Sequence, residues 1–171
     1  RLRIAMPATT DYWVNDCDGE PLFVVTAPAN AGLIQMLPDL LERCRPLLGR
    51  RKATVAFDRG GYSPKSFRQI LRAGFDLLTY RKGPSPAIDE GLFRPVRQRV
   101  DGRLVEYRLH DGVTWMLDRK LMLRQVTRLQ DHHQTPILTS RWDISAATVA
   151  YRMFERWRQE NYFKYMRQEY M

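Results

Sequence analysis

The chain has 171 residues and a formal net charge of +9 at pH 7. This length allows one domain with a modest insertion. A hydrophobic content of 44% and a charged content of 27% are ordinary for a globular protein and exclude an intrinsically disordered one. The apolar runs are too short to cross a membrane, so we expect no membrane partner.

The excess of positive charge, 28 Lys and Arg against 19 Asp and Glu, favours a polyanionic partner. Neutralising phosphates releases bound counterions, which drives association with nucleic acid. A basic surface with no ligand would have the same composition. The two cysteines, Cys17 and Cys44, lie far apart and form no CxxC pair. We therefore expect free thiols in a reducing compartment rather than a disulfide framework.

The chain begins with a predicted hairpin followed by a helix. Residues 9–16 and 22–26 are apolar or β-branched and flank a turn rich in Asn, Asp and Gly, which is typical of two paired strands. Leucines at helical spacing predict a helix over residues 32–48, with Asn30 as its N-cap.

A strand, a helix and a second strand follow. The apolar run over residues 53–57 reads as a buried strand that ends at Asp58 and turns on two glycines. Ser63 and Pro64 are a typical N-cap and first helical residue. The next strand covers residues 75–80. The order of hairpin, helix, strand, helix and strand indicates an α/β fold.

From residue 93 the residue pattern is typical of β-strands. Alternating apolar residues predict an antiparallel meander between residues 93 and 140, with turns at residues 101–102, 111–112 and 131–133. Asp143 is the expected N-cap of a long final helix that continues from residue 144 to the end of the sequence.

Two features carry residue types suited to metal-dependent chemistry. Asp58 follows an apolar strand at the position where α/β sheets commonly bind ligands. Taken alone, an Asp at such a position more often hydrogen-bonds its own glycine turn. On the final helix, Arg156, Glu160 and Arg167 share one face, and Lys164 lies at its edge. An acid between cations suits a metal ligand beside phosphate-binding groups. The alternative is an exposed, ion-paired helix face.

These segments together resemble a known family. Residues 57–63 (FDRGGYS) and 156–164 (RWRQENYFK) are similar to the second and third acidic motifs of DDE-type bacterial insertion-sequence transposases of the insertion-sequence-4 kind. That family places a Tyr-x2-Arg-x3-Glu-x6-Lys signature on the helix that carries its last acid. Arg156, Glu160 and Arg167 occupy the Arg, Glu and Lys positions of this signature.

The chain departs from the signature at two positions. Met153 stands where the family has Tyr, so the contact made by that tyrosine is not expected here. Arg167 replaces Lys, which keeps the positive charge but changes the hydrogen-bonding geometry.

The resemblance implies an RNase H-like α/β fold, in which a mixed sheet is flanked by helices and a β-rich insertion precedes the C-terminal catalytic helix. The corresponding division is a core over residues 1–82, an insertion over residues 83–143 and the catalytic helix over residues 144–171. That fold opens with a strand bearing the first catalytic Asp. Because no acid precedes Asp11, we expect that strand to lie upstream of Arg1.

The resemblance also implies the chemistry. Transposases of this kind cleave DNA and transfer its strands with Mg²⁺ or Mn²⁺, two ions per site. Asp58 and Glu160 would hold the metals, and Arg156, Lys164 and Arg167 would contact the DNA backbone. The implied partner is double-stranded DNA, as transposon ends and as target. The implied setting is the bacterial cytoplasm, on the nucleoid, with a homodimer in the active DNA complex.

Two other hypotheses are compatible with the same residues. The chain could be a catalytically inactive or repurposed DNA-binding protein derived from a transposase, which the absent first Asp and Met153 favour. It could also be an RNA- or partner-binding module with a basic helical arm. The last hypothesis predicts that Asp58 and Glu160 lie far apart in space.

Overall fold

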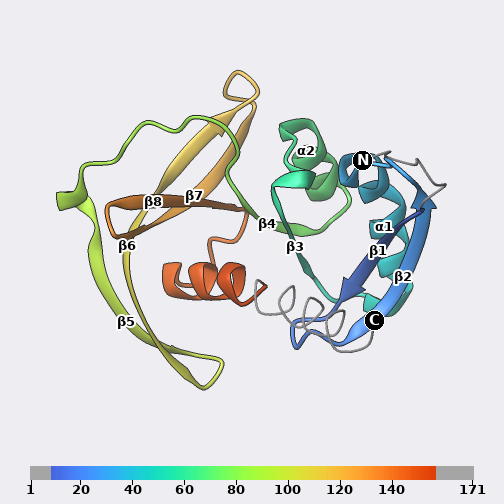
Figure 1. The fold of residues 1–171 in the computed structure, drawn as a ribbon, viewed down its shortest axis with the longest axis horizontal. Helices are drawn as coiled ribbons and strands as arrows, with labels where there is room; N and C mark the ends of the chain where they lie inside the picture. Colours follow the sequence, from blue (N-terminus) through green and yellow to red (C-terminus); the bar gives the residue numbers. More distant parts are fainter. Residues whose placement is uncertain (1–8, 157–171) are drawn as a thin grey trace, which may run out of the picture.

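The computed structural model describes residues 9–156, and its strands form two sheets. The smaller sheet is a hairpin of β1 (Thr9–Asn15) and β2 (Pro21–Pro28). The larger sheet has six strands in the order β3-β4-β8-β7-β6-β5 and is strongly curled (Figure 1). Helices accompany both sheets, so the fold is mixed α/β, as the alternation of strand and helix patterns predicts.

The hairpin leads directly into α1 (Leu33–Leu48). The hydroxyl of Tyr12 donates to the carbonyl of Ala31 and so ties β1 to the entry of this helix. The N-cap is Gly32, which provides no side-chain hydrogen bond, so the expectation that Asn30 caps the helix is wrong. Asn30 instead lies in the preceding turn with a φ of 75°, a conformation that Asn tolerates well.

A βαβ unit follows the first helix. Its elements are β3 (Thr54–Phe57), η1 (Arg59–Gly61), α2 (Pro64–Arg72) and β4 (Asp76–Tyr80). The two strands pair in parallel, which requires a crossover connection such as α2. The hydroxyl of Ser63 accepts a hydrogen bond from the backbone N–H of Ser66, and Pro64 is the first helical residue. Both predictions for this helix start are confirmed.

The second half of the chain completes the large sheet. Its elements are η2 (Glu90–Leu92), β5 (Arg94–Val100), β6 (Arg103–Met116), β7 (Leu121–Gln130) and β8 (His133–Thr139). These strands form the predicted antiparallel meander, and β8 then pairs with β4. The sheet is therefore continuous across the expected boundary between residues 82 and 83. The division at residues 1–82, 83–143 and 144–171 stays a prediction.

Two of the three predicted turns in this half are present. Asp101 and Gly102 have φ values of 46° and 79°, and Asp131 and His132 have φ values of 47° and 60°. Positive φ at both central residues is the conformation that joins antiparallel strands through a two-residue turn.

The third predicted turn, at residues 111–112, is wrong. β6 continues without a break from Arg103 to Met116. The Asp-Gly pair that suggests a turn lies within the strand, because the carboxylate of Asp111 is bound by Arg124 of the neighbouring strand β7. A tertiary ion pair thus overrides the local turn signal.

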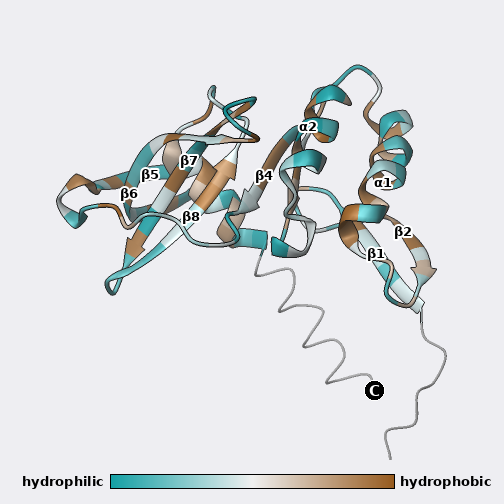
Figure 2. Cartoon of the chain, turned by 90° about the horizontal axis from the view of Figure 1, so that it is seen from above, coloured by the Kyte–Doolittle hydropathy of each residue, from teal (hydrophilic) through white to brown (hydrophobic). Residues whose placement is uncertain are grey.

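The large sheet carries a hydrophobic core on each face. On one face, α1 and α2 pack against residues of β3, β4, β7 and β8, namely Phe57, Leu77, Leu123 and Leu138. On the other face, the helix over residues 146–156 packs against the alternate residues of the same strands, namely Leu78, Val126 and Ile137. Successive strand residues point to opposite faces, which explains this division. Figure 2 shows the hairpin and α1 at one end of the molecule and β5–β8 at the other.

The helix after β8 starts later than predicted. Its cap is Ser145, whose hydroxyl accepts a hydrogen bond from the backbone N–H of Thr148 at 3.1 Å, so the expectation that Asp143 is the N-cap is wrong. Asp143 instead pairs with Arg141. Within residues 9–156, no helix is long and apolar enough to cross a membrane.

The stability of the first core depends on Phe67 of α2. Its side chain is fully buried and packs against the rings of Phe57 and Tyr62, at centroid distances of 6.1 and 5.2 Å. We expect Phe67→Ala to lower the free energy of unfolding by about 3–5 kcal/mol, because it removes buried apolar surface and leaves a cavity. Urea denaturation followed by circular dichroism measures the loss. Val113→Ala, at an exposed position, should change stability by less than about 0.5 kcal/mol; equal effects would contradict this account of the core.

Candidate functional site

Asp58 lies at the carboxyl end of β3, where the chain turns into η1. Its side chain is exposed, and its Oδ1 atom accepts a hydrogen bond from the backbone N–H of Gly60 at 2.8 Å. Its backbone carbonyl accepts from the hydroxyl of Thr79 on β4. The turn hydrogen bond considered from the sequence is thus present. It occupies one carboxylate oxygen and leaves Oδ2 without a donor within residues 9–156, so the carboxylate has an atom available for a ligand.

Close packing leaves no room for a side chain at Gly61, and a side chain at Gly60 would displace the Asp58 carboxylate. A Cβ atom on Gly61 would lie 2.6 Å from the ring of Phe57, and one on Gly60 would lie 2.9 Å from Oδ1 of Asp58. Both distances are shorter than van der Waals contact. The glycines therefore allow the chain to turn sharply over the end of β3 and to hold the Asp58 carboxylate in place.

Three elements meet beside Asp58. The guanidinium of Arg59 lies 5.8 Å from the ring of Tyr80, the last residue of β4. The hydroxyl of Tyr80 donates at 3.4 Å to the carbonyl of Met153 in the helix over residues 146–156. The loop after β3, the end of β4 and this helix are therefore linked through one tyrosine.

The helix is also held by an arginine stacked on an aromatic ring. The guanidinium of Arg128 on β7 lies 3.8 Å from the ring centroid of Phe154. The Phe154 ring also lies 6.2 Å from Tyr80 and 6.0 Å from Tyr107. A cation stacked on the face of an aromatic ring is attracted to it, so this contact helps to fix the rotation of the helix on the sheet.

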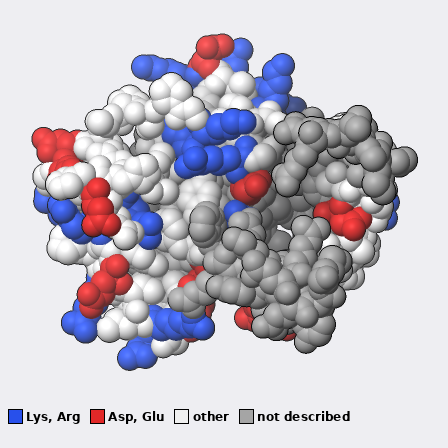
Figure 3. All heavy atoms as spheres, viewed as in Figure 1, with Lys and Arg blue, Asp and Glu red and all other residues white. Residues whose placement is uncertain are grey.

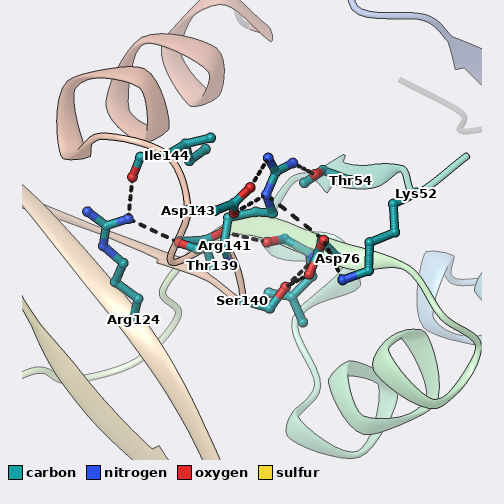
Figure 4. Close-up of polar contacts among 10 residues, drawn as sticks. Lys52, Thr54, Asp76, Arg124, Thr139, Ser140, Arg141, Asp143 and Ile144 are labelled. Atoms are coloured by element: carbon teal, nitrogen blue, oxygen red, sulfur yellow. Dashed lines mark hydrogen bonds and ion pairs between the residues drawn. The ribbon is translucent and has the colours of Figure 1, made fainter.

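The entry to the helix is fixed by Arg124, whose side chain is only 8% exposed. It donates to both carboxylate oxygens of Asp111, at 2.9 and 2.7 Å, and to the carbonyls of Arg141 and Ile144, at 3.0 and 2.7 Å. Figure 4 shows Arg124 reaching from β7 to the segment between β8 and the helix. Because these carbonyls belong to that connection, Arg124 joins the centre of the sheet to the start of the helix.

A second arginine joins the same connection to the βαβ unit. Arg141 donates to both oxygens of Asp143, at 2.6 and 2.7 Å, and to the hydroxyl of Thr54 at 2.9 Å. Its guanidinium also lies 4.0 Å from Asp76, which accepts a hydrogen bond from Ser140. The hydrogen bonds from Arg141 lower the pKa of Asp143 from 3.8 to about 2. The same contacts raise the pKa of Arg141.

The structure places two of the predicted site residues. Asp58 is at the end of β3, and Arg156 is half-buried at the last described position of the helix. Glu160, Lys164 and Arg167 lie outside the described residues, so the separation of Asp58 and Glu160 stays a prediction. Within residues 9–156, no three His, Cys, Asp or Glu side chains are close enough together to hold a metal ion.

The sequence does not single out Tyr80, Arg124 or Arg128. Arg124 lies among buried residues of β7. The sequence pattern predicts an apolar strand there, and it offers no reason for a charged residue within that strand. An arginine in a strand predicted to be buried is a signal for a buried ion pair. Its partner could not be named, because that requires the register between β6 and β7.

The whole chain matches one protein family. The family model Transposase_29, described as "Transposase protein", covers residues 1–171. A comparison with curated proteins finds no match. The family match includes both the described residues and those outside residues 9–156.

The pair of Arg141 and Asp143 predicts a dependence of stability on pH. The pKa of Asp143 is about 2 in the folded chain and 3.8 without its partners. Its ionised carboxylate therefore stabilises the fold above about pH 4, and this contribution disappears as the pH falls through 2. We expect the wild type to be more stable than Asp143→Asn at neutral pH and the difference to shrink between about pH 4 and pH 2. Urea denaturation at each pH measures the free energy of unfolding of both proteins. A difference between them that stays constant or grows as the pH falls would show that the pair does not stabilise the fold.

Proposed function

This chain belongs to the Transposase_29 family of transposase proteins, and from that membership we propose a specific chemistry for it. We propose that it forms the catalytic core of a DDE-type transposase of the insertion-sequence-4 kind. In this proposal it cleaves DNA at transposon ends and joins the cut 3′ ends to a new site. Its partner is double-stranded DNA, and the active complex with DNA contains a homodimer.

The observation that carries the proposal is the placement of Asp58. It stands at the carboxyl end of a strand that pairs in parallel with its neighbour, a common ligand position in α/β sheets. The carboxylate is exposed, and a backbone hydrogen bond fixes its orientation while Oδ2 stays available. A rigid mount with one open oxygen is what a metal-binding carboxylate needs.

The topology supports an RNase H-like arrangement. β3 is at an edge of the six-stranded sheet, and within residues 9–156 the hairpin β1–β2 forms a separate sheet. The strand that carries the first acid in this fold would find unpaired edges on β3 and on the hairpin. Helices on both faces of the sheet agree with the same fold.

Asp58 suits Mg²⁺ or Mn²⁺, because a carboxylate supplies the hard oxygen ligands that these ions prefer. Glu160 is the proposed second ligand residue. When bound, two such ions would activate the attacking oxygen and stabilise the leaving oxygen of a phosphodiester. The backbone N–H of Gly60 orients the Asp58 carboxylate, and Arg156, Lys164 and Arg167 are proposed to bind phosphates beside the cut.

The charge of the chain agrees with a DNA partner. Its net charge is +9, and Figure 3 shows Lys and Arg side chains in several groups on the face that it draws, one of them near the centre. A positive field of this kind attracts the DNA backbone and increases the rate of encounter.

One observation favours a second candidate function, DNA binding without cleavage. Met153 occupies the position of the signature tyrosine, and its side chain is fully buried in the core between helix and sheet. It therefore makes no contact with a substrate. The experiments below separate this function from the catalytic one.

Two aspartates of this protein offer a matched pair of variants. Asp58 and Asp89 each cap a short 3₁₀ helix and accept a backbone N–H at 2.8 Å, from Gly60 and Gly91. Asn keeps the accepting oxygen in both turns but removes the charge. We expect Asp58→Asn to reduce Mg²⁺-dependent cleavage of a plasmid carrying the transposon by about a hundredfold or more, because a metal ligand is lost. Asp89→Asn should cleave like the wild type.

Both variants should keep the melting temperature and the DNA affinity of the wild type. Full cleavage by Asp58→Asn would contradict the assignment of Asp58. A wild-type protein that binds DNA tightly but does not cut it in Mg²⁺ or Mn²⁺ would establish the binding function instead.

The second acid is tested in the same assay. Glu160→Gln should lose cleavage as completely as Asp58→Asn, because both residues are proposed to hold the same pair of ions. Glu155→Gln is the control, since it neutralises an acid five residues earlier in the sequence, whose partly exposed ion pair with Arg103 contributes little to stability. Cleavage that survives Glu160→Gln while Asp58→Asn is inactive would show that the last acid lies elsewhere.

A further inference from the structure

The hairpin of β5 and β6 has one buried face and one exposed face. Strand register places Arg97 opposite Glu106, Arg99 opposite Leu104 and Pro95 opposite Arg108, so these six residues share a face. All six are exposed. The alternate residues of the hairpin pack against the helix over residues 146–156, and they include Val96, Val100, Val105 and Tyr107. We call the exposed residues Arg97, Arg99 and Arg108 the arginine face.

Two of the three arginines of the arginine face, Arg99 and Arg108, carry positive charge that no acid within residues 9–156 neutralises. Residues 94–109 contain five arginines and two acids. Glu106 pairs with Arg97 at 2.9 Å. Arg99 and Arg108 donate to backbone carbonyls, at 3.0 and 3.3 Å, and within residues 9–156 no carboxylate lies in ion-pair distance of either. Their charge is therefore available to an external anion.

A hollow adds to this positive surface. It has a volume of about 620 Å³ and is lined by residues of β5, β6 and β7, among them Arg97 and Arg108 of the arginine face. Arg128 also lines it, but this residue is paired with Leu109 on the opposite face of the sheet and stacks on Phe154. Glu106 is the one acid in its lining. An excess of one sign of charge in a concave surface strengthens the electric field there. The shape and the charge both suit a polyanion.

Protection of a sheet edge does not account for all three residues. Exposed charges on an edge strand prevent pairing with other chains, and β5 is such a strand. Arg108, however, lies on β6, where it is paired with Pro95 on one side and with Leu129 on the other. It has no open edge to protect. A ligand explains its exposed charge, whereas edge protection does not.

We propose that the arginine face is a second DNA-binding surface, which binds the phosphate backbone of duplex DNA away from Asp58. The choice of DNA as the polyanion rests on the proposed function. β5 is five strands away from β3 in the sheet, which is about 24 Å along the sheet at about 4.8 Å per strand. The surface thus holds DNA that flanks the site of reaction.

The test is a binding assay that requires no cleavage. In the triple variant, Arg97, Arg99 and Arg108 are each changed to Gln. Fluorescence anisotropy of a labelled 30-base-pair duplex gives the affinity over a series of NaCl concentrations. Each lost phosphate contact lowers the slope of log K against log [salt] by about 0.9, so we expect a loss of about 2–3 in slope and at least tenfold in affinity.

A matched control removes the same charge elsewhere. Arg43, Arg50 and Arg72, on or beside α1 and α2, are exposed, and Arg43 has an acid partner just as Arg97 does. Changing these three to Gln should alter the slope by less than about 1. A variant with Lys in place of all three arginines of the arginine face should keep the wild-type slope, because it keeps the positive charge. Melting temperatures verify that every variant is folded.

Three results would overturn the proposal. They are equal slopes for the two Gln triples, a loss of affinity at unchanged slope, and tighter binding of duplex RNA that the arginine-face triple abolishes. The outcome is independent of the catalytic proposal. If Asp58→Asn still cleaves DNA while the Gln triple at the arginine face shows a reduced slope of log K against log [salt], the catalytic assignment fails and the binding surface stands. If Asp58→Asn is inactive and the Gln triple binds DNA like the wild type, the catalytic assignment stands and the binding surface fails.

Discussion

The buried guanidinium of Arg124 is the interaction on which the arrangement of the sheet and its last helix depends. It makes four hydrogen bonds, two to Asp111 on β6 and two to carbonyls in the connection between β8 and the helix. A buried charge that loses its partner is strongly destabilising, whereas one that is fully hydrogen-bonded specifies a single geometry. Arg124 therefore determines where the helix enters the curled sheet. Tyr80 and Arg128 then fix its direction and rotation.

This linkage connects parts of the chain that are distant in sequence. β4 pairs with β8 rather than with β5, so the long meander must return to the βαβ unit before the sheet is complete. Arg141 then contacts Thr54 and Asp76 at the beginnings of β3 and β4. The strand that ends at Asp58 and the helix that carries Arg156 are consequently held by one polar network. In a DNA-cleaving enzyme, such rigidity keeps groups from separate elements in register with the substrate.

The sequence predicts those features whose signals are local. Ser63 and the following proline identify the start of α2 because capping depends only on neighbouring residues. The position of Asp58 is predictable because an apolar strand ends there. Predictions fail where a distant partner intervenes: Arg124 holds Asp111 inside β6, and the pairing of Asp143 with Arg141 leaves the capping role to Ser145. Such contacts depend on strand register, which the sequence pattern alone does not provide.

The length of β6 has a consequence for how the protein can be extended. Its first half pairs with β5 and its second half with β7. The two-stranded ribbon of β5 and β6, which ends at the turn of Asp101 and Gly102, therefore projects beyond the part of β6 that pairs with β7. Residues inserted symmetrically at that tip would add rungs to the ribbon without shifting any pairing below it. Each added rung is about 3.4 Å long, which equals the rise of one base pair. In the proposed binding of DNA by the arginine face, loop-length variation at this single turn would adjust how far along a duplex the protein reaches.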